Sequence, residues 1–197
     1  TTMSVKIINK NKVYNFIYRE RTTSKLQIVQ KLQMGLSTVS QNLKVLEEEG
    51  LIEKSGFFES TGGRKAQAIQ IAPTFKFAIG IGILKDKIHM TAIDLYGAVF
   101  CRTAVSHVYA SEEAYYEQLG KHLAAFIQEN HIPSESVLGV SIATQGIIAQ
   151  DGQGVSYGVV MDNSDMKLSD FKKYIPYPCR LEHDSKAAAY LELWNHK

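Results

Sequence analysis

Residues 22–71 read TTSKLQIVQKLQMGLSTVSQNLKVLEEEGLIEKSGFFESTGGRKAQAIQI, a pattern that predicts two short helices followed by a β-hairpin. Apolar residues recur at helical spacing over residues 24–32 and again over residues 37–49. Gly35 lies in the turn between the two helices, and Gly50 ends the second helix before the hairpin begins. The expected N-caps of the two helices are Ser24 and Ser37.

The second helix separates apolar from polar side chains. Val39, Leu43 and Leu46 form its expected buried face. The opposite side carries small or hydrogen-bonding side chains and no carboxylate before Glu47, as in a helix that enters the major groove of DNA without charge repulsion. The alternative is a pair of helices and a hairpin that bind no nucleic acid. The predicted DNA contacts on this helix are Ser37, Thr38, Ser40, Gln41 and Lys44.

The tip of the hairpin has the sequence STGGRK, residues 60–65. Two adjacent glycines leave the backbone uncovered beside two cations, and an arginine on such a backbone fits the negative potential of a narrow minor groove. An ordinary solvated β-turn is the alternative, which the preceding helix disfavours. The predicted DNA contacts in the tip are Gly62, Gly63, Arg64 and Lys65.

Charge is distributed unevenly along the 197 residues. Residues 1–70 contain 11 Lys and Arg against 6 Asp and Glu, whereas the remainder contains 11 against 14. A basic first part on a mildly acidic second part is typical of DNA binding that is confined to the first part.

The order of these motifs resembles the ROK family of bacterial sugar-responsive repressors and sugar kinases. In the repressors of that family a TVSxxLxxLxxxGLI helix precedes an SxGGRxxxxL hairpin. Residues 38–52 match the first pattern, and residues 60–69 match the second with Ile69 in the last position. Ala66-Gln67 stand where a proline is frequent in the family. The resemblance implies a winged helix-turn-helix DNA-binding domain of the α+β class over residues 1–72.

Outside the central stretch, residues 4–20 are expected to form a first helix. Its apolar residues are expected to face the other two helices, and they are Ile7, Ile8, Val13, Phe16 and Ile17. From Pro73 onward the periodicity changes to that of an α/β domain. The expected strands cover 77–83, 87–95, 98–106, 137–142 and 179–182, with a short hairpin over 146–157, and the expected helices cover 111–130, 168–174 and 184–194.

The resemblance implies that residues 73–197 form the first lobe of an actin-like ATPase fold, also called ribonuclease H-like, used for sugar sensing. Family members continue into a second lobe. We therefore expect the chain to be an incomplete, truncated member of the family.

The resemblance also implies a sugar site. The ENDANAAA motif of the family aligns with residues 182–189, where Asp184 is retained and His183 replaces an asparagine. Asp184 as a plain N-cap of the last helix is an equal alternative, and a polar surface loop is the alternative for the loosely aligned Asn163. Gln145 occupies the proline position of the GxxxPG loop. The implied ligand-binding residues are Gln145, Gly146, Asn163, Glu182, His183 and Asp184.

Kinase chemistry is not expected. Kinases of this fold hold ATP phosphates with an Asp and glycines in the first β-turn, the DxGGT pattern. Here Gly82 stands where the Asp belongs, and Leu84 and Lys85 replace the glycines. Lys85 is either a residual phosphate contact or a plain surface lysine. We therefore predict no catalytic residues and no cofactor.

Cysteine and histidine spacing predicts no metal site, because Cys101 and Cys179 lie far apart and no two of the six histidines have ligand spacing. No apolar run approaches the roughly 20 residues that span a bilayer, and no signal peptide is visible. We expect a cytoplasmic protein without a membrane partner.

The sequence therefore predicts a non-enzymatic, sequence-specific transcriptional regulator. Its expected role is repression of carbohydrate-utilisation genes, released or modulated by a sugar or sugar phosphate. The expected partners are a double-stranded DNA operator and a second copy of the chain, because one winged helix reads half of a palindrome. The alternatives are a ROK-type sugar kinase with a DNA-binding head, and a ligand-blind DNA-binding regulator.

Overall fold

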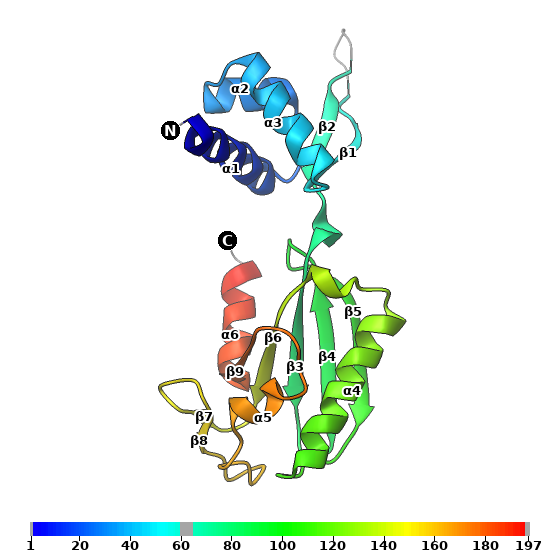
Figure 1. Ribbon diagram of the computed structural model, residues 1–197, viewed down its shortest axis with the longest axis vertical. Helices are drawn as coiled ribbons and strands as arrows, with labels where there is room; N and C mark the ends of the chain where they lie inside the picture. Colours follow the sequence, from blue (N-terminus) through cyan, green and yellow to red (C-terminus); the bar gives the residue numbers. More distant parts are fainter. Residues whose placement is uncertain (1, 60–64, 196–197) are drawn as a thin grey trace. The chain divides into compact units, whose positions relative to one another are not determined.

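The computed structural model describes residues 2–59 and 65–195. The chain divides into two compact units, Thr1–Phe75 and Lys76–Lys197 (Figure 1). The domain limit expected after Ala72 lies directly before the short 3-10 helix η1 (Pro73–Phe75), with which the first unit ends.

The first unit consists of three helices and one hairpin. The helices are α1 (Thr2–Glu20), α2 (Lys25–Leu32) and α3 (Leu36–Glu48), and the antiparallel hairpin consists of β1 (Ile52–Phe57) and β2 (Gln67–Ile71). One small apolar core joins these elements, because each contributes side chains that water does not reach. Its most deeply buried members are Val13, Ile17, Ile28, Val39, Leu46 and Ile71.

The two central helices begin differently. Ser24 caps α2 in a capping box, in which the Gln27 backbone N–H donates to Ser24 Oγ at 3.3 Å and the Ser24 N–H donates to Gln27 Oε1 at 2.8 Å. At α3 the N-cap is Gly35, in extended conformation and without a side-chain hydrogen bond, so the prediction of Ser37 as cap is wrong. The chain enters α3 earlier than expected, and Ser37 lies inside its first turn.

The end of α3 is as predicted. Gly50 adopts a left-handed conformation, with φ +71°. Its N–H donates to Glu47 O at 3.0 Å, and the Leu51 N–H donates to Leu46 O at 2.9 Å. These are the two bonds of a Schellman motif, which turns the chain sharply into β1.

Helix α1 buries only part of the face that the sequence predicts. Val13 and Ile17 are fully buried, whereas Ile7 and Ile8 are each 50% exposed. The prediction that Ile7 and Ile8 face the other helices is therefore wrong. Within residues 4–20, every fully buried side chain lies in the second half of α1, because its first half extends beyond the packed core.

The hairpin is tied to the start of α2. Thr23 pairs with Ile69 of β2 through two backbone hydrogen bonds, Thr23 N–H to Ile69 O at 2.9 Å and Ile69 N–H to Thr23 O at 2.8 Å. A bulge between Lys54 and Gly56 shifts the register of β1 against β2. Gly56 has φ +113°, a conformation that disfavours residues with a Cβ.

The second unit is built on a five-stranded mixed sheet with strand order β5-β4-β3-β6-β9. Strands β3, β4 and β5 form the expected antiparallel meander, while β6 and β9 run parallel to β3 and to each other. The elements are β3 (Phe77–Ile83), β4 (Lys87–Ile93), β5 (Val99–Ser106), α4 (Glu113–Glu129), η2 (Ser134–Ser136), β6 (Val137–Thr144), β7 (Ile147–Ile148), β8 (Val155–Tyr157), α5 (Leu168–Lys172), β9 (Cys179–His183) and α6 (Asp184–Asn195).

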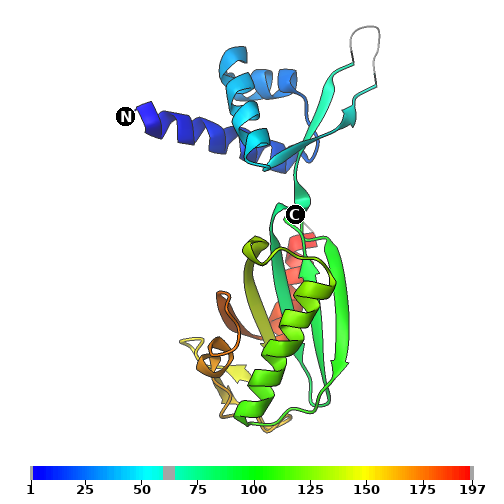
Figure 2. The ribbon, with the colours of Figure 1, turned by 45° about the vertical axis from the view of Figure 1, so that its right-hand side comes forward.

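Helices lie on both faces of this sheet (Figure 2). The alternate residues Phe77, Ile79, Ile81 and Ile83 of β3 are buried in one core with Leu119 and other residues of α4. Helix α6 contacts β6 and β9 on the other face. The expected mixed α/β arrangement is thus observed, and the carboxyl ends of β6 and β9 bring the predicted ligand residues to one edge of the sheet.

Candidate functional site

The solvent-facing side of α3 carries the predicted DNA contacts. Ser37, Gln41 and Lys44 are exposed, and Thr38 and Ser40 are half-buried beside them. The opposite side of α3 is buried, with Val39, Leu43 and Leu46 as predicted. A folded first unit therefore leaves this polar stripe available to a partner.

The start of α3 is suited to an anionic partner. Its first turn contains no acidic residue, and its N-cap Gly35 supplies no side chain to the free backbone N–H groups. Such groups, together with the positive end of the helix dipole, favour phosphate oxygens. Asn42 is not available in the same way, because its Nδ2 donates to Thr38 O at 2.8 Å.

The hairpin tip is described only in part. Gly62, Gly63 and Arg64 lie outside the described residues, so their predicted contacts stay predictions. Lys65 is described and exposed. The arms on either side of the tip pair as far as Phe58, whose N–H donates to Ala66 O at 2.9 Å.

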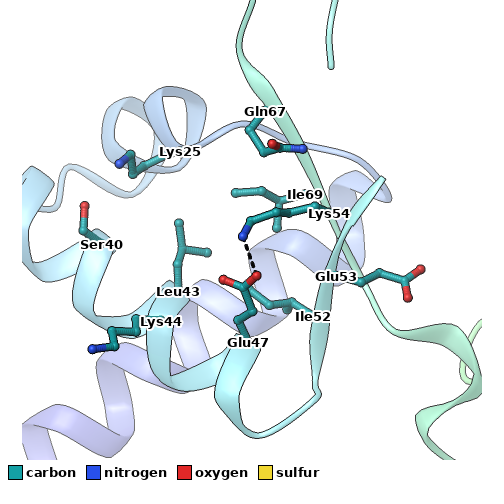
Figure 3. A pocket seen from close by; sticks show the side chains of 10 residues that line it. All are labelled: Lys25, Ser40, Leu43, Lys44, Glu47, Ile52, Glu53, Lys54, Gln67 and Ile69. Carbon is teal, nitrogen blue, oxygen red and sulfur yellow. Dashed lines mark ion pairs between the residues drawn. The ribbon is translucent and has the colours of Figure 1, made fainter. Parts of the chain in front are cut away.

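A groove of about 320 Å³ lies between α3 and the hairpin (Figure 3). Its floor is apolar and consists of Leu43, Ile52 and Ile69, each less than 10% exposed. Its rim combines Ser40 and Lys44, which the sequence predicts as DNA contacts, with the lysines of two other elements, Lys25 and Lys54.

Sequence reasoning missed the contribution of Lys25 and Lys54 to this surface. Lys25 is the first residue of α2, and Lys54 lies on β1, where only Ile52 is buried. The alternation of Ile52, Glu53 and Lys54 before the bulge was the available signal, since alternate strand residues share a face. If Ile52 is taken as a buried residue of a strand, Lys54 lies on the same face, which is the side of the hairpin towards α3.

In the second unit, the loop after β6 is held closely. Gly146 has φ +125°, and a Cβ there would lie 2.9 Å from Val155 Cγ1 and 3.0 Å from Tyr157 O. Gly146 is therefore needed to bring the loop against β8. Gln145 is half-buried, and its backbone carbonyl accepts a hydrogen bond from Asn163 Nδ2 at 2.9 Å.

Asn163 does not present its side chain to solvent. It is fully buried, and its Nδ2 donates to Thr144 Oγ1 at 3.1 Å as well as to Gln145 O. Its Oδ1 has no hydrogen-bond partner among the described residues and faces Gly158, where a Cβ would collide with it. Asn163 thus holds the loop 158–163 against the end of β6, and its ligand contact stays a prediction.

The other predicted ligand residues lie at the end of β9. Glu182 is largely covered, with 14% of its side chain exposed, and pairs with Lys186 at 3.7 Å and Arg180 at 3.5 Å. The Ser185 N–H donates to Asp184 Oδ1 at 2.6 Å and to His183 Nδ1 at 3.1 Å. Asp184 is thus the first residue of α6, and its carboxylate and the imidazole of the preceding His183 both accept from the Ser185 N–H at the start of the helix.

A cavity of about 400 Å³ lies beside these residues. Glu182, His183 and Lys186 line one side, and the β7–β8 hairpin lines the other with Ile147 and Gln150. The structure therefore brings Glu182 and His183 into one pocket. Among the predicted ligand residues, Gln145, Gly146, Asn163 and Asp184 do not line it.

The β3–β4 turn carries side chains where a phosphate-binding turn has none. Gly82 lies opposite His89 in the β3–β4 ladder, and the Leu84 N–H donates to Lys87 O at 3.0 Å. The Lys85 carbonyl accepts from the Tyr109 N–H at 2.9 Å.

The described residues contain no group of three or more His, Cys, Asp or Glu that could hold a metal ion. Within residues 2–59 and 65–195, no helix is both long and apolar enough to cross a bilayer.

Comparison with known proteins gives one consistent group. Residues 78–197 match the profile of the ROK family. A putative xylose repressor of Caldicellulosiruptor sp. (strain Rt8B.4) is 23% identical over 192 residues, which are 96% of this chain and 48% of the relative. The DNA-binding transcriptional dual regulator NagC of Escherichia coli (strain K12) is 23% identical over 189 residues, 95% of this chain and 47% of NagC.

Among solved structures, a ROK family transcriptional regulator that is a homologue of the E. coli MLC protein superposes with a TM-score of 0.61. The identity is 16%, and the match covers 94% of this chain and 47% of that chain, so the likeness concerns the fold. The chain spans about half the length of the curated relatives it matches.

Proposed function

The chain belongs to the ROK family, and on that premise we propose that it is a sequence-specific DNA-binding transcriptional regulator. Its proposed action is repression of carbohydrate-utilisation genes, modulated by a sugar or sugar phosphate. The names of two relatives, a putative xylose repressor and the dual regulator NagC, support the proposal. Residues 1–72 would act as a winged helix-turn-helix, and residues 73–197 as the first lobe of an actin-like sensing domain.

The observation that carries the proposal is the exposed stripe of α3. Ser37, Gln41 and Lys44 share one solvent-facing side, and no acidic residue lies in the first turn of the helix. In the proposed complex, α3 lies in the major groove with this side against base edges and phosphates. Arg64 and Lys65 would extend the contact to the adjacent minor groove.

The effector would act through the second unit. Glu182 and His183 line a pocket at the end of β9, where a sugar hydroxyl could meet both carboxylate and imidazole. A ligand that binds one geometry of the protein better than another shifts the balance between DNA-bound and released forms. We expect a homodimer to bind a palindromic operator, since one recognition helix reads one half-site.

We propose no enzymatic activity for the chain. The β3–β4 turn carries Leu84 and Lys85 instead of the glycines that would admit ATP phosphates, and Gly82 supplies no carboxylate for a metal. A coupled ATPase assay with a panel of hexoses tests this proposal, and turnover that is lost in Asp184→Asn would reverse it.

The test of DNA binding is a selection from a pool of random-sequence duplexes, followed by titration of the enriched sequence at fixed salt. We expect one enriched motif, and weaker binding by Arg64→Ala and Gln41→Ala. The matched control is Lys121→Ala on α4, whose ammonium pairs with Glu117 in the other unit. Failure to enrich any sequence would refute the regulator assignment.

The effector proposal has a separate test. Calorimetric titration with neutral and phosphorylated sugars should give heat with at least one of them, and Glu182→Gln should reduce that heat. The control variant is Glu129→Gln, at the end of α4 and exposed. A chain that binds its operator and gives no heat with any sugar would be a ligand-blind regulator.

A further inference from the structure

The last turn of α3 carries three consecutive glutamates, residues 47–49, at the negative end of the helix dipole. Each glutamate pairs with a lysine from a different place in the first unit. The pairs are Lys54–Glu47 at 2.5 Å, Lys44–Glu48 at 3.8 Å and Lys10–Glu49 at 2.8 Å. The acidic end of the helix that is proposed to meet DNA is thus neutralised by the protein itself.

The Lys54–Glu47 pair differs from the other two in its position. Both of its residues line the groove between α3 and the hairpin, together with Ser40 and Lys44. Figure 3 shows the Lys54 side chain reaching from β1 across to Glu47 on α3. Glu53 also lines the groove, but its side chain extends to the other side of β1 in the same view and accepts a hydrogen bond from Gln70 Nε2 at 2.6 Å.

This pair makes the groove less cationic than its lysines suggest. Lys25, Lys44 and Lys54 line it, and the carboxylate of Glu47 cancels the charge of Lys54. A duplex that lies against the groove brings phosphates, which repel Glu47 and attract Lys54. The single positive charge of Lys54 balances only one of the two anions, so a bound phosphate competes with Glu47 for it.

We propose that the ion pair with Glu47 lowers the sequence-independent affinity of the chain for DNA, and that Lys54 moves from Glu47 to a backbone phosphate when a duplex lies against the groove. This inference rests on the proposed DNA-binding function. In it, Glu47 is a positioning residue that acts through Lys54 and itself makes no contact with DNA.

The exchange is physically accessible because the pair is not buried. The side chains of Lys54 and Glu47 are 58% and 48% exposed. Ion pairs with this exposure contribute little to folding, so separating them costs little. The apolar floor of Leu43, Ile52 and Ile69 stays in place whichever partner Lys54 has, because the buried core holds it.

The test measures sequence-independent binding, which is electrostatic and needs no knowledge of the operator. The full chain is titrated against a fluorescent mixed-sequence duplex of about 30 base pairs at several KCl concentrations. Glu47→Gln should bind about three- to tenfold tighter at low salt, with a salt slope steeper by up to about 0.9. Lys54→Gln should bind more weakly than the parent, and the double variant should return towards it.

The matched control is Glu117→Gln on α4, which makes the same change in net charge. Its pair with Lys121 has similar geometry, 2.6 Å with side chains 49% and 62% exposed, but lies in the second unit. We expect its affinity and salt slope to equal those of the parent. Thermal unfolding of each variant checks that the first unit is intact.

The outcomes separate the inference from the function on which it rests. If the parent binds the duplex and Glu47→Gln binds no tighter, or if Glu117→Gln tightens binding equally, the inference is overturned and the proposed function stands. If Glu47→Gln and Lys54→Gln weaken binding alike, the inference is also overturned, because the ion pair then only stabilises the packing of α3 against β1. A parent that binds no duplex even at low salt overturns both.

Discussion

The two units place their candidate functional residues in opposite settings. In the first unit, Ser37 and Lys44 are exposed on a helix whose other side forms the core, so binding and folding use different atoms. In the second unit, Asn163 and Gly146 hold the loops beside the pocket, and Glu182 is largely covered. Substitutions on the exposed side of α3 should therefore alter DNA affinity without altering stability. Substitutions around the pocket of the second unit should alter both ligand affinity and stability.

The largest effect should come from the core of the first unit. Leu46→Ala removes a side chain that is 1% exposed, and should cost about 2–5 kcal/mol through lost burial and a cavity. DNA binding should disappear with the helical signal of residues 1–75, while the second unit keeps its own transition. Urea denaturation followed by circular dichroism measures both transitions.

Leu36→Ala is the matched control, since Leu36 is 52% exposed at the start of α3. Its stability should stay within about 0.5 kcal/mol of the parent. A single shared transition in both variants would show that the two units unfold as one, and would break the contrast between them.

The second-largest effect is expected in the second unit, where one substitution should reduce both stability and ligand binding. Asn163→Ala leaves Thr144 Oγ1 and Gln145 O without their buried donor, and should cost about 1–3 kcal/mol. Ligand binding at Glu182 and His183 should weaken too, because the loop that Asn163 holds lies next to the β7–β8 hairpin. Chemical denaturation and calorimetry measure the two losses.

Asn130→Ala serves as the comparison for Asn163→Ala. Asn130 is half-buried, and its Nδ2 donates one hydrogen bond, to Phe126 O at 2.8 Å. We expect a smaller loss of stability and unchanged ligand binding. Equal losses in the two variants would remove the special role of Asn163.

The third effect compares two serines at helix starts in the first unit. Ser24→Ala breaks the capping box of α2 and should cost about 1 kcal/mol. Ser37→Ala removes a hydroxyl that caps nothing, so stability should stay within about 0.5 kcal/mol while DNA affinity falls. Thermal unfolding and DNA titration of both variants separate the roles, and a destabilised Ser37→Ala would contradict Gly35 as the cap.

The smallest effect concerns pH. Burial, together with the neighbouring His107, lowers the pKa of His122 below its ordinary 6.5. The folded chain therefore binds this proton less readily than the unfolded chain. The contribution of neutral His122 to the free energy of unfolding is therefore fully present above about pH 6.5, and it is lost as the pH falls below that value.

His122→Gln should remove this dependence and flatten the fall in stability between about pH 7 and pH 5. Thermal unfolding of the second unit across that range measures the difference. His89→Gln, on the exposed side of β4, should retain the full slope of the parent. The contrast fails if both histidine variants flatten the curve equally.

Much of the fold follows from periodicity. Val39, Leu43 and Leu46 define the buried side of α3, and Gly50 ends it, because helical spacing and a left-handed residue are local properties. The strands β3 to β5 follow from alternation and turns in the same way. Ile7 and Ile8 were misplaced because burial depends on how far a neighbouring element extends, which their own spacing does not encode.

The sites were predicted less evenly for the same physical reason. The stripe of Ser37, Gln41 and Lys44 is a property of one helix and could be predicted from it. The roles of Asn163 and Lys54 depend on partners in other elements, Thr144 of β6 and Glu47 of α3. An asparagine at a loop in the family alignment indicates a position near the ligand, but only the packing against Gly158 shows that its side chain turns inward.

The pairing of Thr23 with Ile69 has a mechanical consequence. Thr23 is 1% exposed and immediately precedes Ser24, the N-cap of α2, so two backbone hydrogen bonds join β2 directly to the start of that helix. A displacement of β2 should therefore also displace the first turn of α2. Since β2 is also the strand after which the backbone continues to residues 76–197, this pair of hydrogen bonds links the start of α2 to the strand nearest the second unit in the chain.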